Sequence, residues 1–149
     1  MENLYGLDFP QENEGTENKV VAMEDKRPKR RPFHTWTVNG QEYKLKLTTA
    51  FITQLENKYR RNLMTLLTDG DIPPLAVMLT VTQGAMAPWN HGVSYPDVQR
   101  LYERWVEDGG SQMEFYTQII MPTLAVSGFF TQSQVDSIMN SMKEAEMLM

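Results

Sequence analysis

The sequence contains no cysteine, and this absence excludes several kinds of chemistry at once. A chain without cysteine forms no disulfide, builds no thiolate metal site and has no thiol nucleophile. Histidine is scarce as well, because the chain has only His34 and His91, which do not stand at the spacing of metal ligands. Neither a GxxxxGKS/T pattern nor a GxGxxG pattern occurs, so nucleotide chemistry has no support. We therefore expect neither a cofactor nor an enzyme active site.

Long apolar runs are also missing from the sequence. No stretch approaches the roughly 18 uninterrupted apolar residues that a membrane span needs, and the polar N-terminus lacks the apolar centre of a secretory signal. The formal net charge of −5 makes the chain a poor electrostatic match for nucleic acid or an anionic membrane. These absences predict a cytoplasmic protein whose partners are other proteins.

The N-terminal segment differs in composition from the rest of the chain. It is polar and charged, and it has too few apolar residues to offset the entropy of ordering. We therefore predict a disordered arm over residues 1–32 and one domain over residues 33–146. The apolar fraction of the 149-residue chain is 41%, which is enough to build the core of such a domain.

A basic run ends the predicted arm, and its last three residues are Lys29, Arg30 and Arg31. Three ring-bearing residues follow shortly after it: Phe33, His34 and Trp36. Together they could pair phosphate contacts with base stacking on single-stranded nucleic acid. The acidic residues just before the run, and the acidic balance of the domain behind it, favour a solvated linker instead.

The domain is predicted to open with a β-hairpin. Two β-prone runs, residues 35–38 and 42–47, flank Asn39-Gly40, which is the strongest short hairpin signal. Apolar residues alternate with threonine and lysine along these runs, at Trp36, Val38, Tyr43, Leu45 and Leu47. One face of the hairpin must therefore be covered, and helices have to supply the cover because two strands alone are marginal.

About five helices are predicted after the hairpin, from apolar periodicity and capping residues. The first is capped by Thr48 or Thr49, and the second covers about residues 72–86 with Pro73 in its first turn. The third follows the capping pair Ser94 and Asp97. The fourth, capped at residue 111, is expected to be the most buried and to end or kink at Pro122, and the fifth begins after residue 131. The predicted class is α+β, mainly α, with the hairpin packed on the helices.

The last predicted helix is rich in methionine, and its candidate partner-binding residues are Ile138, Met139, Met142 and Met147. Methionine is unbranched and polarizable, so it packs into a partner's groove as easily as into a core. Met139 and Met142 could belong either to the core or to a partner-binding surface, and the sequence leaves both alternatives open. Met147 stands close to the end of the sequence, where burial is harder, so an adaptable binding edge is predicted there.

The hairpin and the helix after it carry a recognisable motif. Residues 37–48 read TVNGQEYKLKLT and lead into a helix that begins FITQLE at residues 51–56. This order resembles the tail assembly chaperones of long-tailed bacteriophages and the related proteins of gene transfer agents, in which a G-x-x-Y-x-L-x-L-T strand leads into a helix with a Leu-Glu pair. The matching positions are Gly40, Tyr43, Leu45, Leu47, Thr48, Leu55 and Glu56. As an ordering of elements, the similarity spans roughly Trp36 to Met142.

The resemblance implies a helper protein that acts in the host cytoplasm and is absent from the mature virion. Such a protein coats the long, apolar tape measure protein, keeps it soluble and helps to gather tail tube protein subunits around it. It also implies a homo-oligomer, because many weak copies along one client supply avidity. The basic arm lies outside the family pattern.

Two other functions remain open from the residues. The first is a small phage DNA-binding regulator that uses Lys29, Arg30 and Arg31, which predicts salt-sensitive DNA binding. The second is a structural tail or head completion protein that stays in the particle. Mass spectrometry of purified virions distinguishes such a component from a chaperone, which is absent from them.

Overall fold

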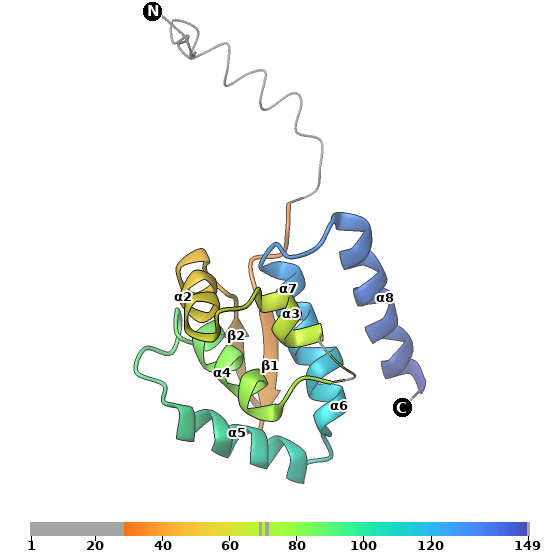
Figure 1. The fold of residues 1–149 in the computed structure, drawn as a ribbon. Helices are drawn as coiled ribbons and strands as arrows, with labels where there is room; N and C mark the ends of the chain where they lie inside the picture. Colours follow the sequence, from red (N-terminus) through yellow and green to blue (C-terminus); the bar gives the residue numbers. More distant parts are fainter. Residues whose placement is uncertain (1–28, 69, 71, 149) are drawn as a thin grey trace, which may run out of the picture.

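The chain is described here from a computed structural model, which defines residues 29–68, 70 and 72–148. These residues form one antiparallel β-hairpin and six helices, which confirms the predicted mainly helical α+β class (Figure 1). The predicted disordered arm falls mostly on residues 1–28, which lie outside the described residues. Within the described part of the chain, no helix is both long enough and apolar enough to cross a membrane.

The hairpin consists of β1 (His34–Val38) and β2 (Gln41–Leu45), paired so that Trp36 lies opposite Tyr43. Asn39 and Gly40 both have positive φ, 52° and 81°, which is the geometry of a type I′ turn and the reason that this dipeptide favours a hairpin. The predicted apolar face is buried through Trp36, Val38, Leu45 and Leu47. Tyr43, which was also predicted on this face, is half-buried.

Two short helices follow the hairpin. α2 (Thr49–Tyr59) is capped by Thr48, one of the two predicted caps, whose hydroxyl accepts a hydrogen bond from the N–H of Phe51. α3 (Leu63–Thr68) is tied to α2 because a carboxylate oxygen of Glu56 accepts the N–H of Leu63 at 2.8 Å. Glu56, half of the Leu-Glu pair noted in the sequence, thus satisfies one of the free donors that every helix start leaves.

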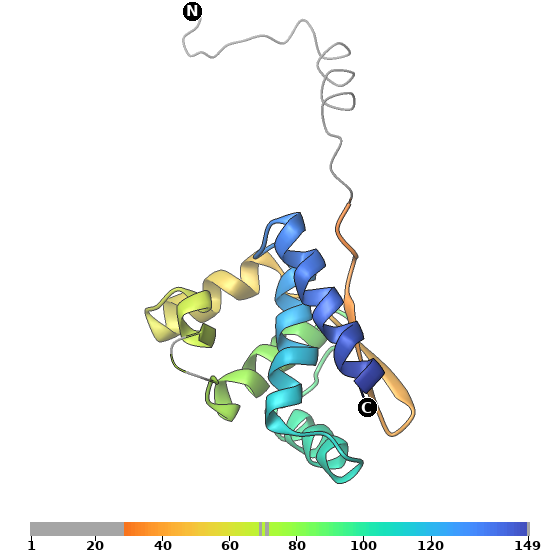
Figure 2. The ribbon, with the colours of Figure 1, turned by 90° about the vertical axis from the view of Figure 1, so that its right-hand side faces the viewer.

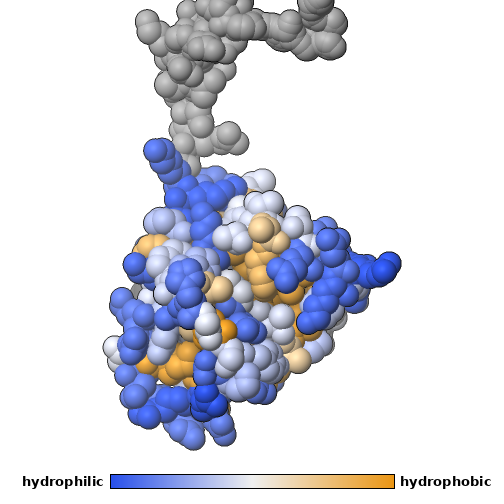
Figure 3. Space-filling model, turned by 90° about the vertical axis from the view of Figure 1, so that its left-hand side faces the viewer, coloured by the Kyte–Doolittle hydropathy of each residue, from blue (hydrophilic) through white to orange (hydrophobic). Residues whose placement is uncertain are grey.

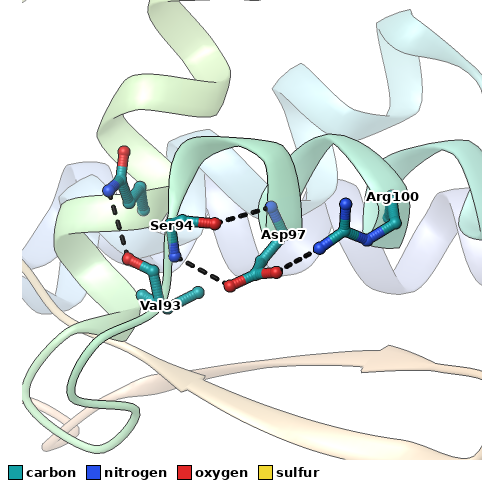
Figure 4. Close-up of polar contacts among 5 residues, drawn as sticks. Val93, Ser94, Asp97 and Arg100 are labelled. Atoms are coloured by element: carbon teal, nitrogen blue, oxygen red, sulfur yellow. Dashed lines mark hydrogen bonds and ion pairs between the residues drawn. The ribbon is translucent and has the colours of Figure 1, made fainter.

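α4 (Leu75–Met86) begins three residues later than predicted. Ile72 and Pro73 each precede a proline, and the ring of a following proline disfavours helical backbone at the residue before it. The expectation that Pro73 lies in the first turn of the helix was therefore wrong. The start of α5 (Tyr95–Glu107) was predicted correctly, because Ser94 and Asp97 form a reciprocal capping box (Figure 4).

The central helix has three continuous parts, which are α6 (Gln112–Glu114), the wider π-helical turn η2 (Phe115–Ile120) and α7 (Met121–Val126). The helix does not end at Pro122. Proline has no N–H for the i→i−4 bond to the carbonyl of Gln118, but His34 Nε2 lies 2.8 Å from that oxygen and donates to it. A side chain of β1 thus replaces the hydrogen bond that proline removes.

The central helix instead ends after Val126, where Gly128 completes a Schellman motif. The N–H of Phe129 donates to the carbonyl of Leu124 at 3.2 Å, and that of Gly128 donates to Ala125 at 3.4 Å. Gly128 has φ of 95°, a left-handed conformation that is costly for residues with a Cβ atom.

We expect Gly128→Ala to lower the free energy of unfolding by about 1–2 kcal/mol, the cost of left-handed backbone for a residue with a Cβ atom. Gly128→Asn is the control, because asparagine tolerates this conformation better than alanine and should lose less. Urea unfolding followed by circular dichroism measures both variants. An alanine variant as stable as the original chain would contradict the proposed role of Gly128.

Candidate partner-binding site

The sixth helix, α8 (Gln132–Leu148), turns back along the central helix and forms an αα-hairpin with it (Figure 2). Its start is capped by Thr131, whose hydroxyl accepts the N–H of Gln134 and whose own N–H donates to the side chain of Gln134. None of the side chains described in α8 is fully buried. The backbone of α8 lies close to α7 and farther from η2, so the two helices diverge along their length.

A groove of about 360 Å³ lies between the diverging helices. The central helix contributes Thr117, Gln118 and Met121 to its walls, and α8 contributes Ile138, Ser141 and Met142. Ile138 and Met142 are four residues apart, so they lie on one face of α8 and point to the same groove. Both are half-buried, as is Met121 on the opposite wall. The groove therefore has an apolar lining with polar residues beside it.

The structure brings together two of the four predicted partner-binding residues. Ile138 and Met142 line the groove, whereas Met139 lies on another side of α8, with its sulfur 3.9 Å from a guanidinium nitrogen of Arg31. Met147 belongs to α8, but its side chain lies outside the described part of the chain.

The opposite wall of the groove was not predicted from the sequence. Met121 lies in the helix that the sequence predicts to be the most buried, although Thr117 and Met121 stand four residues apart, a spacing that indicates one face of a helix. Met113 lies one turn before Thr117, which donates to its carbonyl at 3.1 Å, and is 54% exposed. An apolar side chain thus stands exposed on the central helix beyond the groove.

The residues of the basic run have different roles. The guanidinium of Arg30 donates to the carbonyl of Ala125 at 3.3 Å and to that of Phe130 at 2.7 Å, so Arg30 is bound to the helical body. Arg31 approaches Met139, and Lys29 is exposed.

The ring-bearing residues after the run do not form a stacking surface. His34 and Trp36 are 8% and 1% exposed, so neither can stack on a base without leaving the core. Phe33 packs edge-on against Trp89 at 5.6 Å between ring centroids, and the Lys44 amine lies 4.9 Å above its ring. The stacking half of the nucleic-acid hypothesis is therefore wrong for this fold.

A second hollow, of about 580 Å³, lies between the hairpin turn, the loop before α5 and α5 itself. Arg104 donates to the side chain of Asn39 at 2.8 Å and to Asp108 at 3.1 Å, and Arg100 pairs with Asp97. Hydrogen bonds from Ser94 lower the pKa of Asp97, and Arg100 adds to this effect (Figure 4). The bond from Arg104 to Asn39 joins α5 to the hairpin turn, and the other pairs lie within α5 and its cap. We therefore assign this hollow a structural role.

Figure 3 shows the face on the left-hand side of Figure 1, opposite α8, where apolar atoms lie in recesses among hydrophilic side chains. Among the described residues, no group of three or more histidine, aspartate or glutamate side chains is placed to hold a metal ion.

The geometry defines the chain as a small α+β protein with an apolar groove on an αα-hairpin. Residues 30–149 match a family of unknown function, DUF6096, and the chain belongs to that family. The match begins at Arg30, whose side chain donates to the carbonyls of Ala125 and Phe130. No curated protein and no solved structure matches the chain significantly.

Proposed function

We propose that this protein is a tail assembly chaperone of the phage type, which binds a helical segment of the tape measure protein in the groove between α8 and the central helix. The observation that carries the proposal is the apolar lining contributed by Met121, Ile138 and Met142. A groove between two helices accepts the apolar face of a third helix, and this mode of recognition needs no catalytic group. The motif of residues 37–56 supplies the phage context.

Methionine on both walls suits a client with a variable surface. Its unbranched side chain adopts several shapes at little cost, so one groove accommodates successive helical segments that differ in detail. Each contact is small and weak by itself, but many copies along one elongated client add their affinities. The proposal therefore includes self-association of the chaperone on the client, and recruitment of tail tube protein to the coated client.

The test is co-expression with the product of the longest downstream open reading frame, followed by a pull-down and a solubility assay. We expect a soluble complex with the original chain and loss of that complex with Ile138→Asp and Met142→Asp combined. Each carboxylate would have to be buried against apolar client surface, which should weaken binding at least about 100-fold.

Ser137→Asp combined with Asn140→Asp is the matched control, because both residues are exposed on the same helix. This variant adds the same charge and should leave the complex intact. If both double variants retain the complex, the groove is not the binding site. If the original chain neither solubilises nor co-purifies with the client, the chaperone proposal fails, and the presence of the protein in purified virions would support a structural component instead.

A further inference from the structure

Arg30 lies where the chain enters the helical body, and its side chain joins two parts of the αα-hairpin. One guanidinium nitrogen donates to the carbonyl of Ala125 in the last turn of α7, and the other donates to the carbonyl of Phe130 in the connection to α8. Gly128 lies between these two residues, and a Cβ atom at its position would be 4.0 Å from Arg30 Nε. The connection between the helices therefore curves around the guanidinium.

The chemistry of arginine suits this position. The last carbonyls of a helix carry its partial negative charge, and a cation placed there is stabilised. The guanidinium is a rigid, planar fork, so two carbonyls that bind its two nitrogens are held at a fixed separation and orientation. A lysine at this position would keep the charge but would not fix both carbonyls together.

The core does not fix the direction of α8, because α8 places no fully buried side chain in it among those described. The cap at Thr131 starts the helix but does not orient it. α8 has 17 residues and is about 25 Å long, so a small rotation at the connection becomes a large displacement at its far end. The groove lies along the part of α8 that diverges from the central helix.

We infer that Arg30 is a positioning residue that sets the angle between α8 and the central helix, and through it the width of the groove. That a client binds in the groove rests on the proposed function. That Arg30 sets the width of the groove does not depend on it. Arg30, which the sequence pattern linked to nucleic acid, thus acts within the fold. The chain therefore enters the helical body at the residue that sets the width of the groove.

The absence of cysteine allows a direct test. Thr117→Cys and Ser141→Cys introduce two exposed labelling sites on opposite walls of the groove. Spin labels on these cysteines report the width of the groove by double electron–electron resonance without any client. We expect Arg30→Ala to give a longer and broader distance distribution than the parent. Amide exchange in α8 should become about tenfold faster, with α2 unchanged.

Lys29→Ala is the matched control, because it removes one charge from the same run and should leave the distribution unchanged. Arg30→Lys should give an intermediate distribution, and it keeps the test decisive if Arg30→Ala does not fold. The inference is overturned if the Arg30→Ala and Arg30→Lys distributions superimpose on that of the parent, or if Lys29→Ala shifts it equally. Since no client is added, either result leaves the chaperone proposal to its own test.

Discussion

Trp36→Ala is expected to lower the free energy of unfolding by about 3–5 kcal/mol, a large part of the total stability of a small domain. Trp36 is 1% exposed and lies on the covered face of the hairpin. Its ring packs edge-on against Phe115 of the central helix and Trp105 of α5, with centroids 5.2 Å and 6.4 Å away. The side chain therefore joins three elements, and alanine would leave a cavity at the point where they meet.

Trp89→Ala is the control for this prediction, since it removes the same side chain from a position that is 40% exposed. It should cost about 1 kcal/mol, mainly through the lost edge contact with Phe33. Trp36→Phe should retain much of the stability, because the indole N–H of Trp36 is buried without a hydrogen-bond partner among the described residues. Urea unfolding followed by far-ultraviolet circular dichroism measures all three. Equal losses for Trp36→Ala and Trp89→Ala would contradict the assigned core.

His34→Ala is expected to cost about 2–4 kcal/mol. It removes a buried ring and also leaves the carbonyl of Gln118 without the donor that compensates for Pro122. His34→Gln retains an N–H donor of similar reach and should lose less. Pro122→Ala in the His34→Ala background restores a backbone N–H to the central helix, so it should recover part of the loss. If the changes in free energy of unfolding from His34→Ala and Pro122→Ala were simply additive in the double variant, His34 would not act on the helix turn at Pro122.

The His34 site also predicts a dependence of stability on pH. Burial lowers the pKa of His34 below its ordinary value of 6.5, the bond to the Gln118 carbonyl opposes this shift, and the charge of Arg31 adds to it. The unfolded chain therefore binds a proton near pH 6.5, whereas the folded chain resists it. The stabilisation from neutral His34 is complete above that pH and is lost as the pH falls below it toward the folded pKa.

Denaturant unfolding between about pH 7.5 and about pH 5 measures this effect, because histidine is the side chain that ordinarily titrates there. As the pH is lowered over this range, the free energy of unfolding should decrease for the original chain and should decrease less for His34→Gln. Asp97, whose pKa is also lowered, stays ionised in this range in both the folded and unfolded states and does not contribute. An unchanged pH slope in His34→Gln would contradict the burial of a neutral imidazole.

Elements whose signals are local could be predicted from the sequence. Asn39-Gly40 specified the turn because both residues tolerate positive φ, and Thr48 and Ser94 specified helix starts because each bonds a backbone N–H three residues away. Alternation along the strands identified the covered face, including Trp36. The late start of α4 follows from an equally local rule, because helical backbone is disfavoured at the residue before a proline.

Features that depend on partners distant in the sequence could not be predicted from local patterns. Pro122 is accommodated by His34, which bonds a residue 84 positions away, and Arg30 binds carbonyls 95 and 100 positions away. The groove likewise needs two walls, and periodicity indicated Ile138 and Met142 on one helix without showing that Met121 faces them. Local patterns report which side of an element is apolar, but the element that covers this side, or leaves it open, is selected only when the whole chain packs.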